Sequence, residues 1–159
     1  MSRQHNAWLL PLSLLAAILL GLLPLPGWMQ PFRPYWLALA LVYWIIEAPD
    51  RVGLGFAFLL GVVADLTFGS LLGEQALRLT VMAFIVQRFR AQLRFFPLSQ
   101  QALAVAGLLL NDRIVSAAVH LALDEPQLPP NFWWTPLIGM LLWGPVFLML
   151  DRLRLGGRN

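Results

Sequence analysis

Four charged residues lie within apolar stretches of the sequence and are its best candidates for chemistry. They are Asp65, Arg78, Asp112 and Arg113. A carboxylate inside a membrane costs about 3 kcal/mol or more unless it is paired or protonated. Residues in this setting form a proton or ion path, line a pocket for a small molecule, or make ion pairs that fix helix register. The sequence favours ion pairs because arginines accompany the carboxylates.

Helical spacing predicts that these groups lie at one level. Asp65 and Asp112 each lie about 18 Å from the start of their segments, at 1.5 Å per residue. Glu74 precedes Arg78 by one turn, in the favourable orientation for an ion pair. A polar ridge at four-residue spacing follows Asp112 along its helix: Ser116, His120 and Asp124. We therefore expect one polar cluster that includes Asp65 and Asp112, with Arg78 or Arg113 supplying the opposite charge.

Motifs typical of enzymes are missing from the sequence. It contains no cysteine, no H-E-x-x-H, no G-x-S-x-G and no P-loop. The two histidines, His5 and His120, are far apart in the chain. We expect a protein without catalytic residues, a metal site or a cofactor.

The composition predicts an integral membrane protein. Of the 159 residues, 59% are apolar and 12% are charged, whereas soluble domains carry about 45–50% and about 25%. The mean hydropathy is +0.71. All eleven basic residues are arginines that lie between apolar runs, whereas nucleic-acid-binding proteins cluster basic residues on one solvated face. We therefore expect no nucleic-acid partner.

Apolar segments define a single domain, 1–159. None alternates polar and apolar residues at the period of a membrane β-strand, so helices are the remaining way to satisfy the backbone in lipid. The fold class expected is an all-α, six-transmembrane-helix bundle. Its helices are predicted at roughly 7–25, 35–48, 53–70, 74–89, 100–123 and 132–150.

The arginines predict how this bundle is oriented. With six spans and a cytoplasmic N-terminus, eight of the eleven arginines lie on the inside and Arg33 alone lies in an outer loop. The positive-inside rule therefore places both termini in the cytoplasm. The loop 124–131 is expected outside.

A ridge of small residues follows the third segment at four-residue spacing. Residues on one ridge of a helix allow another backbone to approach closely when they are small. Two interpretations are open, namely packing inside the bundle and a binding face for another protein. The ridge consists of Gly53, Ala57, Gly61, Gly69 and Gly73, with Asp65 on the same line. For Gly69 and Gly73 a helix break is a further interpretation, because they join two segments without a polar loop.

Several of these residues also belong to a pattern that resembles the MreD family, whose members are membrane subunits of the bacterial rod-shape system. The matching pieces are Phe32-Arg33-Pro34 with Trp36, the run Leu41-Val42-Tyr43-Trp44, Pro49 with Arg51-Val52, and Gly61-Val-Val-Ala-Asp65-Leu66 continuing to Gly69-Ser70 and Leu72-Gly73. The last stretch is the most specific. Asp112 also lies where the family is expected to carry an acidic residue, whereas Arg113 is not a feature of the family.

The resemblance implies a non-enzymatic protein of the bacterial inner membrane. It implies MreC as the direct partner, with MreB, RodA and penicillin-binding protein 2 reached through the complex that directs lateral peptidoglycan synthesis. The implied fold is similar to the substrate-binding subunits of energy-coupling-factor transporters. That similarity keeps a second function open, a small-molecule or lipid-binding and transport subunit that uses the intramembrane polar cluster. Membrane lipid is an expected partner in either case.

Overall fold

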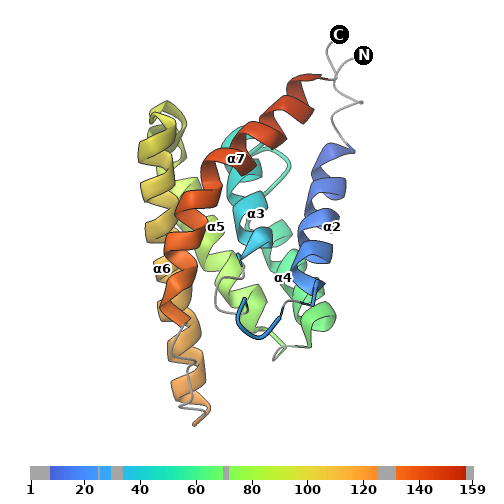
Figure 1. The fold of residues 1–159 in the computed structure, drawn as a ribbon, viewed down its shortest axis with the longest axis vertical. Helices are drawn as coiled ribbons and strands as arrows, with labels where there is room; N and C mark the ends of the chain where they lie inside the picture. Colours follow the sequence, from blue (N-terminus) through green and yellow to red (C-terminus); the bar gives the residue numbers. More distant parts are fainter. Residues whose placement is uncertain (1–7, 25, 30–33, 70–71, 125–131, 157–159) are drawn as a thin grey trace.

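The computed structural model describes residues 8–24, 26–29, 34–69, 72–124 and 132–156, and all regular structure within them is helical. The helices run alternately up and down and pack into one bundle (Figure 1). They are α2 (Leu9–Leu22), α3 (Trp36–Glu47), α4 (Leu54–Phe68), α5 (Glu74–Phe95), α6 (Leu98–Ala122), the short 3-10 helix η2 (Phe132–Trp134) and α7 (Thr135–Gly156).

Helix α3 occupies the centre of the bundle. It is apolar on every side, and a helix of that kind must be enclosed by other elements. Ten of its twelve residues, Leu37 to Ile46, are buried, and it packs against α2, α5 and α7. The predicted segment 35–48 is therefore the core of the protein.

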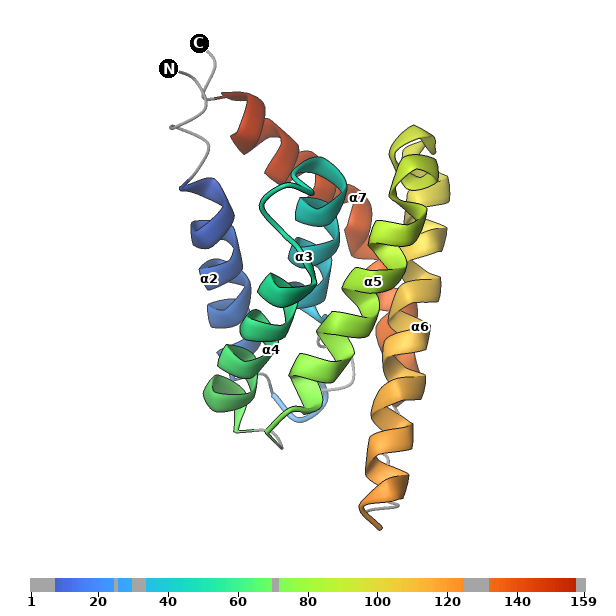
Figure 2. The same cartoon turned by 180° about the vertical axis from the view of Figure 1, so that it is seen from behind.

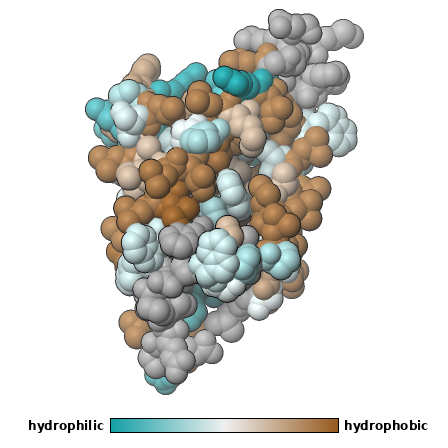
Figure 3. Space-filling model, in the orientation of Figure 1, coloured by the Kyte–Doolittle hydropathy of each residue, from teal (hydrophilic) through white to brown (hydrophobic). Residues whose placement is uncertain are grey.

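The outer faces of the bundle are apolar as well. Leu66 on α4, Leu103 on α6 and Leu141 on α7 are each at least 67% exposed. Figure 3 shows brown, hydrophobic atoms over the middle of one face and teal, hydrophilic atoms gathered toward its upper end. Exposed apolar area of this extent is typical of a surface that contacts lipid or another protein.

Helix lengths divide the bundle into two kinds of element. Helices α6 and α7 are long and apolar enough to cross a membrane, over Leu98–Ala122 and Thr135–Leu155. Helices α2, α3 and α4 are apolar but have 14, 12 and 15 residues. The 22 residues of α5 include Glu74, Arg78 and three arginines near its C-terminal end.

Two helix ends differ most from the predicted apolar segments of the sequence. Helix α5 continues to Phe95, beyond the predicted end at 89, because the arginines that interrupt the apolar run are good helix formers. It ends before Pro97, which disfavours helical backbone in the preceding residue. Helix α7 continues to Gly156 rather than 150 and contains Pro145. A proline inside a helix removes one backbone hydrogen bond and bends the axis, and Figure 1 shows the second half of α7 leaning away from α6.

The α3–α4 connection, the α5–α6 connection and the end of α7 lie at one end of the bundle, as both ribbon views show (Figures 1 and 2). We call it the arginine-rich end, because the segments that meet there carry Arg51, Arg88, Arg90, Arg94, Arg152 and Arg154. The start of α2 lies at the same end. The C-terminal ends of α2, α4 and α6 lie toward the opposite end.

Candidate functional site

The tight corner between α4 and α5 places Asp65 at the start of α5. Gly69 and Gly73 adopt left-handed backbone with φ of 68° and 98°, a conformation that glycine adopts without the penalty of a side chain. The corner returns the chain so that the Asp65 carboxylate accepts hydrogen bonds from the backbone N–H groups of Gly73 at 2.8 Å and Gln75 at 2.9 Å. These amides have no partner within the helix. Asp65, which is buried, therefore caps α5 from the neighbouring helix.

The small-residue ridge of α4 faces the first turn of α5. A Cβ atom built on Gly61 would lie 2.8 Å from the carbonyl carbon of Gln75 and closer still to the backbone of Ala76. Ala57 is fully buried on the same ridge. At Gly53, which precedes α4, a Cβ atom would meet nothing within 4 Å. The centre of the ridge thus packs within the bundle, and Gly69 and Gly73 serve the corner instead.

Arg78 and Asp112 form a buried, bidentate ion pair between α5 and α6. The Arg78 Nε donates to Asp112 Oδ1 at 2.8 Å, and its Nη2 donates to Oδ2 at 2.7 Å. Glu74, one turn earlier on α5, approaches the Arg78 Nη1 at 3.6 Å. The pair is sequestered, since Arg78 is 7% exposed and Asp112 is 1% exposed. A guanidinium that meets a carboxylate with two parallel hydrogen bonds is the strongest geometry for such a pair.

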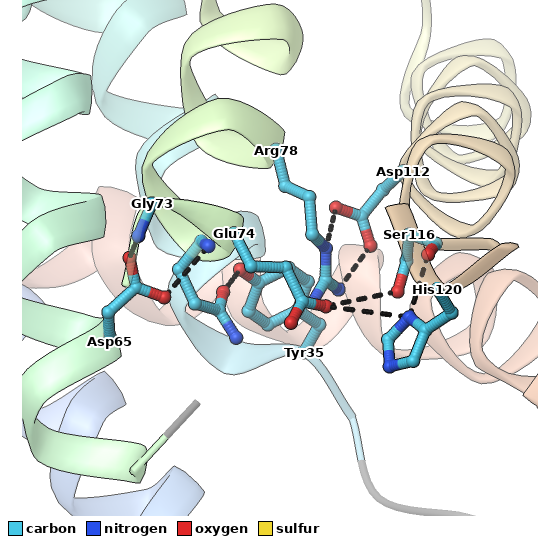
Figure 4. Close-up of polar contacts among 9 residues, drawn as sticks. Tyr35, Asp65, Gly73, Glu74, Arg78, Asp112, Ser116 and His120 are labelled. Carbon is cyan, nitrogen blue, oxygen red and sulfur yellow. Dashed lines mark hydrogen bonds and ion pairs between the residues drawn. The ribbon is translucent and has the colours of Figure 1, made fainter. Parts of the chain in front are cut away.

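Tyr35 and Gln75 connect this ion pair to Asp65. The Tyr35 hydroxyl donates to Oε1 of Gln75, and the Arg78 guanidinium lies over the Tyr35 ring at 5.0 Å from its centre. On the other side, Ser116 donates to Glu74 at 3.3 Å, and His120 lies 4.0 Å from the same oxygen. Figure 4 shows these side chains as one continuous chain of contacts from α4 across α5 to α6. We call it the Arg78 network: Tyr35, Asp65, Glu74, Gln75, Arg78, Asp112, Ser116 and His120.

The Arg78 network can act as a lock between helices. Its buried carboxylates accept hydrogen bonds from specific donors, so each helix has one register in which all the groups are satisfied. The network joins the residue before α3 to α4, α5 and α6, which are far apart in sequence. Ion pairing that fixes register is therefore the chemistry that these contacts support most directly. The ordered set of carboxylates, a guanidinium and a histidine is also the kind from which proton paths are built.

The other residues singled out in the sequence lie elsewhere. Arg113 is half-buried on α6 beside Asp112, and Asp124 is exposed just after α6. Of the residues in the family pattern, Phe32, Arg33 and Ser70 lie outside the described residues. Pro34 precedes α3, and Pro49 and Arg51 form the α3–α4 turn, where the N–H of Arg51 donates to Ala48 O at 3.1 Å.

A second polar cluster at the arginine-rich end was missed in the sequence. The Nη2 atom of Arg154 on α7 lies 3.0 Å from Oε2 of Glu47 on α3 and 2.9 Å from Oδ1 of Asp151. The Tyr43 hydroxyl donates to Oδ1 of Asp151 at 3.3 Å. We call this the Arg154 cluster. Its residues stand at the ends of apolar segments, where charges were interpreted only as markers of orientation. The acidic residues Glu47 and Asp151 among arginines were the available signal.

Tyr35 and Gln75 were also missed as members of the Arg78 network. A tyrosine next to an apolar segment is common at a membrane interface, and a neutral glutamine beside Glu74 carries no distinctive pattern. Both are placed by the fold, since the α4–α5 corner presents Gln75 to the residue that precedes α3.

Comparison with known proteins identifies a family that the chain matches. The model of the family described as rod shape-determining protein MreD matches residues 2–153. The rod shape-determining protein MreD of Haemophilus influenzae is 34% identical over 142 residues, which cover 87% of this chain and 85% of that relative. No solved structure matches the chain.

Proposed function

Because the chain belongs to the MreD family of rod shape-determining membrane proteins, we propose that it is a non-enzymatic subunit of the complex that directs lateral peptidoglycan synthesis. The observation that carries this proposal is the family match over residues 2–153, which covers all the described helices except the last three residues of α7. The cell-shape role follows from the family. The position of the chain within a complex, its partners and its orientation in the membrane are proposed here in addition.

The distribution of polar groups supports a role in assembly. The carboxylates of the Arg78 network are turned inward and satisfied by other groups of the chain, whereas the outward faces of α4, α6 and α7 are apolar. A protein built in this way presents surfaces for contact rather than reactive groups. Packing of apolar helices against neighbouring helices is how membrane subunits associate.

We infer that MreC is the direct partner and that MreB, RodA and penicillin-binding protein 2 are reached through the complex. The described connections are short, with residues 48–53 between α3 and α4 and residues 96–97 between α5 and α6. A stable interface buries roughly 800 Å² on each partner. Loops of this size cannot supply that area, so helix faces must contribute to the contact with MreC.

We also propose that the six α-helices form a transmembrane bundle in the bacterial inner membrane, with both termini in the cytoplasm. The common placement of six arginine-bearing positions at one end of the bundle supports this orientation, because arginine accumulates on the cytoplasmic side. The likeness to substrate-binding subunits of energy-coupling-factor transporters remains a prediction from the sequence.

Two measurements on the same strain test the proposal. The tagged chain replaces the MreD of a rod-shaped bacterium, in which cell shape is recorded and MreC is sought in the detergent-purified sample. We expect rod shape and captured MreC, with neither from an equally tagged, unrelated multi-span protein. Restored shape without captured MreC would contradict the partner assignment. If MreC is captured but the cells stay round, the chain binds MreC without supporting rod shape, and the cell-shape part of the proposal is contradicted.

A further inference from the structure

A groove between α5 and α6 is separate from the Arg78 network. It has a volume of about 340 Å³, within the range of about 300–1,000 Å³ that is usual for ligand pockets. The groove begins near the connection between the two helices, at the arginine-rich end, where α5 and α6 run side by side in both ribbon views. Its lining is mostly apolar, and it comprises Ile85, Phe89, Gln92, Leu93 and Phe96 of α5 with Ala104, Gly107, Leu108 and Asn111 of α6.

The floor of the groove on α6 is open because of a glycine. A Cβ atom built on Gly107 would meet nothing within 4 Å, so this position neither packs against α5 nor is filled by another described side chain. Glycine in a helix interior costs about 1 kcal/mol relative to alanine, and here no close approach within the chain requires it. Gly107 therefore leaves the groove open at this point.

The polar groups around the groove are neutral or positively charged, and each of them can donate a hydrogen bond. Gln92 and Asn111 contribute two side-chain amides, for which the described part of the chain offers no hydrogen-bond partner, and no acidic residue lines the groove. Arg88 lies three residues after Ile85 and four before Gln92, so it flanks the same face of α5. Arg88 is exposed, and none of the described carboxylates pairs with it.

These observations define the chemistry of an occupant. It must carry an apolar portion that fits between Phe89 and Leu108, and an anionic portion that meets Arg88, which flanks the groove on α5. Basic positions between helices at the cytoplasmic face suit lipid phosphates, and amide N–H groups donate to phosphate and ester oxygens. We propose that the α5–α6 groove binds an anionic phospholipid, with the phosphate at Arg88 and Gln92 and one acyl chain across Gly107.

The test compares two lipids and two pairs of variants. The purified chain, without MreC, is titrated with phosphatidylglycerol or with phosphatidylcholine of identical acyl chains, and bound lipid is counted by native mass spectrometry. Arg88→Gln removes the charge at the groove, and Arg94→Gln removes an equal charge from the opposite face of α5. Gly107→Leu fills the groove, and Gly55→Leu adds the same side chain at an exposed glycine of α4 that also has open space around it.

We expect wild type to retain phosphatidylglycerol in preference to phosphatidylcholine by about fivefold, the value for one arginine near an anionic surface. Arg88→Gln abolishes the preference, Gly107→Leu lowers retention of both lipids, and the two control variants behave as wild type. Equal retention of the two lipids, or a preference that survives Arg88→Gln, would overturn the proposal. If Gly107→Leu spares lipid binding but reduces capture of MreC from cells, the groove holds a partner helix and the lipid assignment is wrong. Because Arg88 is exposed, its variant keeps the test valid even if Gly107→Leu does not fold.

Discussion

Asp65 and Asp112 are both buried aspartates, but the groups that they hold differ. Asp65 accepts two backbone N–H groups at the start of α5, whereas Asp112 accepts two hydrogen bonds from the guanidinium of Arg78. Replacing aspartate by asparagine, which has the same shape but no charge, therefore has different consequences at the two positions. The lost charge at a helix start removes a favourable interaction with the helix dipole, whereas the lost charge beside a buried guanidinium leaves that cation uncompensated.

We expect Asp112→Asn to lower the free energy of unfolding by about 3–5 kcal/mol, because it breaks a buried ion pair from one side. Thermal unfolding of the purified protein in detergent measures the change. Neutralising the cation as well, in Arg78→Gln with Asp112→Asn, should restore part of the loss. Asp124→Asn, at an exposed aspartate just after α6, is the matched control. A single variant as stable as the control would show that the pair contributes nothing to the fold.

Asp65→Asn should cost less, about 1–3 kcal/mol, since the amide oxygen still accepts one N–H group while the other loses its charged acceptor. Folded yield and cell shape should fall together if the role of Asp65 is structural. The informative result is a variant in which cell shape is lost while folded yield is unchanged. A variant that is made in normal amount and captures MreC, yet leaves cells round, would mean that the Arg78 network handles a proton or a ligand.

At the scale of elements, the sequence predicted the helices better than their contacts. Each apolar segment corresponds to a helix, because hydropathy reports where a helix must be shielded from water. Position along the helix axis was also predictable, and it placed Arg78 and Asp112 at one level. The rotation of each helix about its axis was not, so the sequence left open whether Arg78 or Arg113 supplies the charge. It could not foresee that the left-handed backbone at Gly69 and Gly73 turns α5 back onto Asp65.

Gly61 is the position where α4 and α5 approach most closely among the ridge residues. We expect Gly61→Ala to destabilise the protein by about 1–3 kcal/mol, because the added methyl group meets the backbone of Ala76 rather than a side chain that could move. Gly55→Ala, on the same helix with open space around it, should be neutral or slightly stabilising. Unfolding midpoints of the two variants, measured in one detergent, give the comparison. Equal midpoints would mean that the ridge does not set the packing of α4 on α5.

At the scale of the whole molecule, the two polar clusters lie at different levels of one bundle. The Arg78 network joins the start of α5 to α6, and the Arg154 cluster joins the ends of α3 and α7. The central helix α3 lies between them, since Tyr35 immediately precedes it and Glu47 is its last residue. Apart from Trp36 at its start, the polar side chains of α3 lie near its C-terminal end, where Tyr43 and Glu47 take part in the Arg154 cluster, so its first half has none to fix its position along the bundle axis. Contacts at both ends supply that constraint.

The orientation of the bundle can be measured with cysteines placed at the two ends of α6. The chain has no native cysteine, and both Ser99 and Leu123 are exposed. We expect a membrane-impermeant maleimide to label Leu123→Cys in spheroplasts and to label Ser99→Cys only after the membrane is opened, because arginine-bearing segments remain in the cytoplasm. The reverse pattern of labelling would invert the proposed topology.

The unequal helix lengths also have a consequence for the surrounding bilayer. At 1.5 Å per residue, α2 and α4 are about 21 and 22 Å long, while α6 is about 37 Å long. A hydrocarbon layer is about 30 Å thick, so hydrophobic mismatch differs around the perimeter of the protein. In the proposed transmembrane bundle, lipids beside α2 and α4 would be compressed, at an elastic cost that grows by a fraction of a kcal/mol per ångström. Neighbouring proteins with short spans relieve this strain, so the bilayer itself would draw them to the α2–α4 side.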